Sequence, residues 1–157
     1  MILSNFFYSS ILFNKFINKF VKNGQKEKIE LIFLKFIFKL SKDKLLHTSF
    51  LFYFFEIIEK QFPLVWTRIY FKKGSKTHIP FFPKKEHRYK ISCQLVAKSV
   101  VYSRSQKFED KLKNTLFSYF DRYTFYNLKG ICIKEEEYNN SVSNRNLKHF
   151  RWKGKIK

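Results

Sequence analysis

Apolar residues recur every three or four positions in the first part of the chain, which is the pattern of helices with one buried side. Phe13 to Val21 predicts a first helix, and Asn23-Gly24 predicts a left-handed cap at its end. A second helix is predicted over residues 29–40, with its lysines gathered opposite an apolar face. That face consists of Ile29, Ile32, Phe33, Phe36, Ile37 and Leu40, and the lysines are Lys28, Lys35, Lys39 and Lys42.

A third helix is predicted from about Lys44 to Gln61, and its aromatic run over residues 50–55 makes it apolar on nearly every side. We therefore expect this helix to lie at the centre of a helical bundle. The pattern then changes to short extended pieces rich in β-branched and aromatic residues. Val65 to Tyr70 predicts one strand, and Thr77 to Phe82 predicts a second.

The two strands are joined by the basic stretch 72–76, in which Gly74 is suited to the left-handed turn conformation. An isolated two-stranded hairpin is only marginally stable, so we expect an exposed basic hairpin to project into a partner. A short surface turn that happens to be basic is the alternative.

Helical patterns return after Pro83, with a fourth helix beginning near residue 84, a fifth from about Lys107 to Tyr123 and a sixth from about Lys134 to Phe150. The fourth helix begins with cations, although the helix dipole favours acids there, and a phosphate bound from outside would explain them. The sixth helix has glutamates first and cations last, which is the favourable order.

These elements predict a mainly α fold, a six-helix bundle with a protruding two-stranded β-hairpin between the third and fourth helices. We expect residues 1–157 to form a single domain with three appendages. They are an apolar N-terminal extension at 1–9, a hairpin arm at 64–82 and a basic tail at 153–157.

The net charge limits the classes of partner that the protein can have. The chain has 32 Lys and Arg and 12 Asp and Glu, so its formal net charge is +20 over 157 residues. Such a chain needs a polyanion, either nucleic acid or an anionic membrane surface. Since 45% of the residues are hydrophobic and 21 are Phe, a folded core is expected rather than a disordered basic tail. Lysines and glutamates interrupt every long apolar run, so no membrane insertion is expected.

The sequence contains no glycine-rich phosphate loop, no paired metal ligands and only scattered histidines. We therefore expect no enzymatic activity, no cofactor, no metal and no small-molecule substrate. Cys93 and Cys132 fit no zinc spacing and are expected to be free thiols in a reducing compartment. The many Lys, Phe, Ile and Asn residues suit A/T-rich codons, which indicates an organelle genome.

The end of the chain places Arg145, Lys148 and Arg151 at three-residue spacing, with Phe150 and Trp152 beside them. Phosphates and an unstacked base would both find partners there. The alternative is a basic helix end that complements the helix dipole, with the aromatic residues in the core.

Two stretches resemble signatures of the small-subunit ribosomal protein S-seven family in its bacterial and organellar form. The first is Phe16-Ile17-Asn18-Lys19 followed by Lys22-Asn23-Gly24-Gln25-Lys26, and the second is Asn144-Arg145 with His149-Phe150-Arg151-Trp152. Weaker matches lie between them, in the hairpin, at Pro83-Lys84-Lys85, and at Gly130 with Lys134-Glu135. The resemblance covers about residues 9 to 152.

The resemblance implies a structural protein that binds the 3′ domain of small-subunit ribosomal RNA and nucleates assembly of the head, with its hairpin near the exit site. Implied neighbours are head and platform ribosomal proteins of the S-nine and S-eleven types, messenger RNA and exit-site transfer RNA. We expect phosphate neutralisation to dominate RNA binding. The implied location is the mitochondrial matrix, with a plastid-type organelle as the alternative.

The expected RNA-binding residues are basic or aromatic and come from the first-helix loop, the hairpin, the fourth-helix start and the tail. They are Lys15, Lys19, Lys22, Lys26, Arg68, Lys72, Lys73, Lys76, Lys84, Lys85, Arg88, Arg145, Lys148, His149, Arg151 and Trp152. Two other classes remain alternatives, a nucleoid-type DNA-binding protein and a membrane-surface basic protein.

Overall fold

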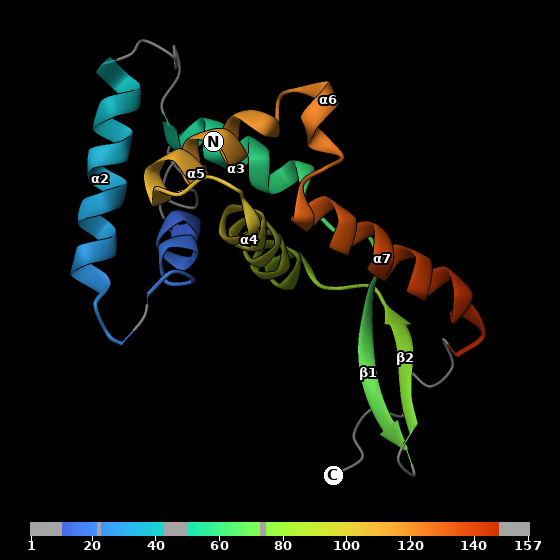
Figure 1. Cartoon of the computed structure of the whole chain (residues 1–157). Helices are drawn as coiled ribbons and strands as arrows, with labels where there is room; N and C mark the ends of the chain where they lie inside the picture. The colour runs from blue at the N-terminus through green and yellow to red at the C-terminus, as the bar shows by residue number, and fades with distance from the viewer. Residues whose placement is uncertain (1–10, 22, 43–49, 73–74, 148–157) are drawn as a thin grey trace, which may run out of the picture.

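The computed structural model describes residues 11–21, 23–42, 50–72 and 75–147. It confirms the predicted fold class, a mainly helical body with an antiparallel hairpin between α3 and α4 (Figure 1). A helical segment at residues 11–17 comes first. The remaining elements are α2 (Lys26–Lys42), α3 (Phe50–Lys60), β1 (Trp66–Lys72), β2 (Ser75–Phe81), α4 (Lys85–Tyr102), α5 (Phe108–Ser118), α6 (Arg122–Phe125) and α7 (Lys129–Ser143).

The turn before α2 forms as the sequence predicts. Asn23 has φ 52° and Gly24 has φ 73°, so both adopt the left-handed conformation that ends helices. The preceding helix is shorter than predicted, because regular helix ends at residue 17 and turns follow at 18–20. Phe16, Ile17 and Phe20 are nevertheless buried as the periodicity requires.

The amphipathic pattern of α2 is confirmed for the residues whose side chains are described. Phe33, Phe36 and Leu40 are buried, whereas Lys28, Lys35 and Lys39 are exposed. The side chain of Lys42 lies outside the described part. A row of large apolar side chains on α2 is also exposed, which the pattern did not predict. The row consists of Leu31, Leu34 and Phe38, exposed by 56%, 61% and 62%.

The helix at the centre of the body is α4, so the prediction that the third helix is central is wrong. α3 leaves Phe52 62% exposed. α4 contacts α3, α5 and α7, and it buries residues along most of its length. The small residue Ser99 allows α7 to approach it closely, since its hydroxyl lies 2.8 Å from the Gly130 amide nitrogen. Aromatic content therefore did not identify the central helix.

The predicted fifth helix is divided in two, because α5 ends at Ser118 and the short α6 follows. Asp121 starts α6, since its carboxylate accepts hydrogen bonds from the Tyr123 amide (3.2 Å) and the Thr124 hydroxyl (2.8 Å). These hydrogen bonds lower the pKa of Asp121, the Thr124 bond most strongly. Asp121 was therefore a sequence signal for the break between the two helices. The helical spacing of the apolar residues runs across this position, so the break was not predicted.

α7 begins at Lys129, earlier than the predicted start at Lys134, and it ends at Ser143. The predicted charge order is therefore wrong, since the three glutamates lie in the middle of the helix and Arg145 lies after it. Tertiary packing sets the start, because the Gly130 amide donates a 2.8 Å hydrogen bond to the Ser99 hydroxyl of α4. A side chain of another helix thus caps α7. The residues near the start of α7 do not by themselves predict such a cap.

The hairpin is longer than predicted at its outer end, with pairs running from Trp66 opposite Phe81 to Lys72 opposite Ser75. Because side chains alternate across a strand, Trp66 and Arg68 share one hairpin face and Thr67 lies on the other. The Thr67 hydroxyl donates a hydrogen bond to the Glu137 carboxylate of α7. In the described part of the chain, no helix has the length and apolarity needed to cross a membrane.

Candidate nucleic-acid interface

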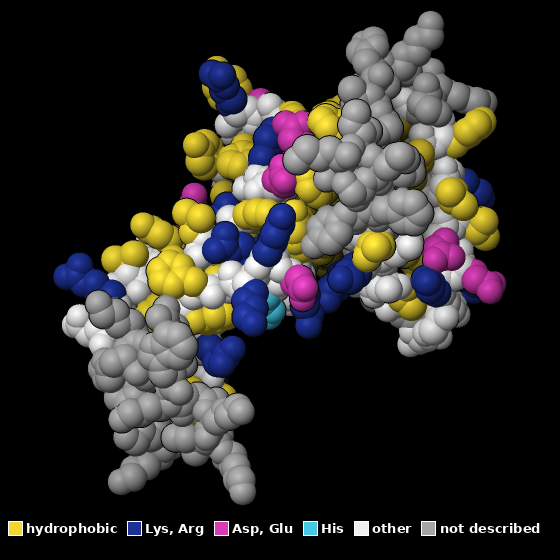
Figure 2. All heavy atoms as spheres, turned by 180° about the vertical axis from the view of Figure 1, so that it is seen from behind, with side chains coloured by type: hydrophobic (Ala, Val, Ile, Leu, Met, Phe, Trp, Pro, Cys, Tyr) yellow, Lys and Arg dark blue, Asp and Glu magenta, His cyan; other side chains and the backbone are white. Residues whose placement is uncertain are grey.

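A groove of about 310 Å³ separates the base of the hairpin from α4. We call it the arm groove. Its lining comes from one strand residue and one face of α4, and consists of Trp66, His87, Lys90, Ile91, Gln94, Leu95 and Lys98. Ile91 and Leu95 are buried and form its apolar floor, while the four polar side chains of α4 are exposed. Figure 2, seen from behind, shows Lys and Arg side chains gathered across the middle of the molecule with a histidine among them.

Arg68 is brought next to the start of α4 by two ring contacts. Its guanidinium carbon lies 5.0 Å from the centroid of the Phe81 ring, and the Phe81 and His87 ring centroids are 6.0 Å apart. Arg68 itself remains exposed. The hairpin base and the fourth-helix start, predicted as separate basic stretches, therefore adjoin each other.

The start of α4 carries exposed cations at Lys84 and Lys85. Arg88 is different, because it is half-buried and its Nε–H donates a 2.9 Å hydrogen bond to the Pro83 carbonyl. That bond gives Arg88 a local structural role at the helix start. Lys84 precedes the helix in an extended conformation and its side chain makes no capping hydrogen bond.

Lys15 and Lys19 lie beside α4 as well, on the helical segment 11–17 and the turn after it. The Cys93 thiol of α4 lies 4.0 Å from the Leu12 carbonyl oxygen, so this segment packs directly on α4. Burial raises the pKa of the Cys93 thiol to about 11, and the nearby charges of Lys19 and Lys15 oppose this rise. Both lysines are exposed. Two sets of predicted RNA-binding residues thus lie against the same helix.

The other predicted residues are more scattered. Lys26 is exposed at the start of α2, where it forms a 3.3 Å ion pair with Glu30. Lys76 lies on the hairpin face opposite to Arg68, with its ammonium 5.9 Å from the Phe71 ring centroid. Arg145 is exposed in the turn after α7. The side chain of Lys72 and all of Lys22, Lys73, Lys148, His149, Arg151 and Trp152 lie outside the described residues.

Sequence reasoning missed the arm groove itself. Lys90, Gln94 and Lys98 recur at four-residue spacing, so they form a polar stripe along an otherwise buried helix. That stripe was a detectable signal of a functional face. Trp66 carried no such signal, because its pattern indicated only a strand residue.

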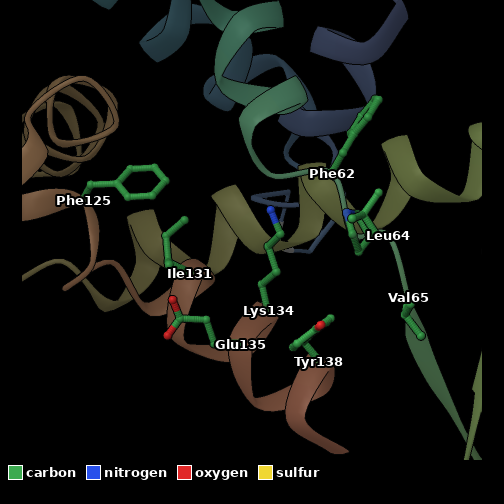
Figure 3. A pocket seen from close by; sticks show the side chains of 9 residues that line it. Phe62, Leu64, Val65, Phe125, Ile131, Lys134, Glu135 and Tyr138 are labelled. Carbon is green, nitrogen blue, oxygen red and sulfur yellow. The ribbon is translucent and has the colours of Figure 1, made fainter. Parts of the chain in front are cut away.

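A second hollow, of about 260 Å³, lies between the segment before β1, α6 and α7 (Figure 3). Its walls are mainly apolar and include Phe62, Leu64 and Tyr138. Lys134 projects from α7 toward the end of α3, where its ammonium donates a 3.0 Å hydrogen bond to the Lys60 carbonyl. Burial lowers the pKa of Lys134. This hollow therefore lacks the exposed cations of the arm groove.

These features define a class of protein, a helical polyanion binder with a basic hairpin arm. Among the residues that the structure describes, no group of His, Cys, Asp and Glu is placed to hold a metal ion. A family model described as Ribosomal protein S7p/S5e matches residues 1–145, and the chain belongs to this family. No curated protein matches the chain.

Membership in this family confirms the resemblance to the S-seven family found in the sequence. The chain is a structural protein of the small ribosomal subunit that binds ribosomal RNA and ribosomal proteins, and the family is not enzymatic. The match includes the first signature and only the Asn144-Arg145 part of the second.

Proposed function

We propose that the chain binds the 3′ domain of small-subunit ribosomal RNA and nucleates assembly of the head. The observation that carries this proposal is the arrangement around α4. Lys90 and Lys98 of α4 line the arm groove, and Arg68 of the hairpin adjoins the start of the same helix. Lys15 and Lys19 belong to the N-terminal segment that packs on α4 near Cys93. Basic residues from three separate parts of the chain thus converge on one helix.

Phosphate neutralisation is the main source of affinity on such a surface, because each lysine acts as a point charge and releases condensed counterions from the RNA. Lys90 and Lys98 lie two helical turns apart, which is about 12 Å along the helix axis. They therefore contact different phosphates. Specificity comes from the shape of the folded RNA, since side chains do not fit the deep, narrow major groove of an A-form helix.

The hairpin extends away from the helical body (Figure 1), and its outer part carries Lys76. The sequence between Phe71 and Ser75 adds Lys72 and Lys73. We propose that it approaches the exit-site region, where messenger RNA and exit-site transfer RNA pass. A basic arm suits this role, because it reaches phosphates that the body does not contact.

Exposed apolar side chains are proposed to meet neighbouring head and platform ribosomal proteins of the S-nine and S-eleven types. The row of Leu31, Leu34 and Phe38 follows helical spacing along α2. Tyr123 and Tyr126, exposed by 90% and 67%, form a second apolar area near α6. Apolar surface of this kind is typical of protein contacts rather than of phosphate contacts.

We further propose that the ribosome concerned is mitochondrial, with a plastid-type organelle as the alternative. The support is compositional, because only 4 Gly and 3 Pro accompany 21 Phe and 9 Tyr in 157 residues. Fractionation of the source cells tests this proposal. Recovery of the protein with cytoplasmic ribosomes alone would contradict it.

Two experiments test the main proposal. In a sucrose gradient of ribosomal particles, the protein is expected to migrate with the small subunit. With purified protein, affinity for a 3′-domain RNA fragment is expected to fall by roughly a thousandfold or more between 50 mM and 200 mM salt. Equal affinity for duplex DNA would favour a nucleoid-type protein, and binding to lipid vesicles in place of RNA would favour a membrane-surface protein.

A further inference from the structure

Trp66 occupies a distinctive place in the arm groove. It begins β1, pairs with Phe81, and its half-buried side chain forms the hairpin wall of the groove opposite the polar stripe of α4. The groove volume of about 310 Å³ is at the lower end of the range for small-ligand sites. A space of this size suits one aromatic ring system and its attached groups.

The side chains around Trp66 combine three kinds of chemistry. The indole and the buried Ile91 and Leu95 supply apolar surface, the Gln94 amide supplies both a donor and an acceptor, and Lys90 and Lys98 supply exposed positive charge. A nucleotide has a matching set of groups, namely a flat base, a polar base edge and flanking phosphates. Proteins recognise unpaired RNA bases through this combination of aromatic stacking and edge hydrogen bonds.

The second hollow lacks this combination, although its volume is similar. The ammonium of Lys134 already donates a hydrogen bond to the Lys60 carbonyl, and its pKa is lowered by burial. Its apolar walls in Figure 3 come from Phe62, Leu64 and Ile131. The arm groove is therefore the better site for a nucleotide.

We propose that the arm groove binds one unpaired base of the ribosomal RNA, stacked on Trp66. In this arrangement Gln94 contacts the edge of the base, while Lys90 and Lys98 contact the phosphates on either side. The inference rests on the proposed rRNA binding and adds a specific subsite to it. A fully paired RNA helix cannot place a base in the groove, because its bases are stacked on each other and their edges are paired.

The two tryptophans of the chain, Trp66 and Trp152, make a direct experiment possible. In a Trp152→Phe protein, which keeps an aromatic ring at position 152, Trp66 is the sole tryptophan, so its fluorescence reports on the groove in the full-length chain. Titration with the 3′-domain RNA fragment is expected to quench this fluorescence by stacking. A fully paired RNA duplex of equal length is expected to bind with little quenching.

Affinity measurements with labelled RNA complement the fluorescence. Trp66→Leu is expected to weaken binding of the fragment by about tenfold, whereas Trp66→Phe retains a stacking surface and loses less. Tyr123→Leu serves as the control, because Tyr123 is 90% exposed on α6 and does not line the arm groove. Gln94→Ala, at an exposed position on α4, is expected to weaken binding severalfold.

The outcomes separate this inference from the function on which it rests. Fragment binding with unchanged Trp66 fluorescence and no effect of Gln94→Ala would overturn the base-stacking site and leave rRNA binding intact. Absence of fragment binding by the wild-type protein at low salt would instead overturn the proposed function. Equal quenching by the paired duplex would show that Trp66 senses bound RNA without stacking on a base, which also contradicts the inference.

Discussion

The hydroxyl of Thr67 in β1 donates a hydrogen bond to the carboxylate of Glu137 in α7, across 70 residues of sequence. Thr67 is 7% exposed, and its hydroxyl also lies 3.4 Å from Nδ1 of His78 in β2. This bond ties the hairpin to α7 near the hairpin base. The direction in which the arm projects therefore depends on α7 as well as on the strand ends.

Replacement of Glu137 tests this role. Glu137→Ala removes the carboxylate that accepts the hydrogen bond of the buried Thr67 hydroxyl, so it is expected to lower the free energy of unfolding by about 1–3 kcal/mol. Amide exchange in β1 and β2 is expected to accelerate. Glu137→Gln keeps an acceptor and should retain most of the stability, and Glu136→Ala, at an exposed position, is the control. Equal urea midpoints for Glu137→Ala and Glu136→Ala would contradict the prediction.

Replacement of Gly130 even by alanine is expected to destabilise the protein. A Cβ atom at this position would lie 2.5 Å from the Leu95 carbonyl oxygen and 2.6 Å from the Ser99 hydroxyl. Gly130→Ala should therefore destabilise the protein by about 1–3 kcal/mol, although alanine is the better helix former by about 1 kcal/mol. Thermal unfolding measures the effect, with the exposed Lys129→Ala as control. A stabilised Gly130→Ala protein would show that α4 and α7 are not packed so closely.

Tyr119 is expected to make stability depend on alkaline pH. Its hydroxyl accepts a 2.9 Å hydrogen bond from Gln61 Nε2, and burial raises the pKa of Tyr119 to about 12. Since the folded protein holds this proton more tightly than the unfolded chain, its contribution is complete below pH 10 and is lost between pH 10 and about 12. That loss is about 2–3 kcal/mol.

Urea unfolding at several pH values measures this dependence by comparison with Tyr119→Phe, which should lack the loss assigned to this hydroxyl. At neutral pH the same variant is expected to lose about 1–2 kcal/mol, because the Gln61 amide is left without its partner. Tyr123→Phe is the control, since Tyr123 is 90% exposed. Identical pH profiles for wild type and Tyr119→Phe would contradict the assignment.

The two cysteines are expected to differ in reactivity. Cys93 is 1% exposed and burial raises its thiol pKa to about 11, so little thiolate forms at pH 8. Cys132 is only half-buried. A thiol reagent at pH 8 should therefore modify Cys132 rapidly and Cys93 only after unfolding. Single-cysteine proteins made by Cys93→Ala and Cys132→Ser measure each rate, and equally fast modification would contradict the packing around Cys93.

Lys98 is expected to contribute one phosphate contact to RNA binding. Lys98→Gln should lower the slope of log affinity against log salt by about one, with similar losses for different RNA sequences that contain the site. Lys60→Gln is a matched control, because the Lys60 ammonium is already engaged by Glu56 at 3.3 Å and by the Phe120 ring at 3.8 Å. Equal slopes for wild type and Lys98→Gln would place Lys98 outside the RNA contact.

Helical periodicity predicted the buried side of α2, and turn chemistry predicted the left-handed pair Asn23-Gly24. The β-branched and aromatic residues on either side of the basic turn predicted the two strands. These features were predictable because each depends on residues within a few positions of one another. The Asp121 cap that separates α5 from α6 was equally local, but the apolar period through residues 107–123 obscured it.

The sequence by itself determined the family, the positive charge, the helical class and the place of the hairpin, since periodicity, composition and motif are properties of neighbouring residues. Tertiary structure alone decided that α4 is central, that Ser99 caps α7, and that Trp66 faces Lys90 and Lys98 across a groove. The physical reason is that close packing joins residues far apart in the chain. Those contacts depend on side-chain volumes and on the distances between helices. Neither of these produces a periodic pattern in the sequence.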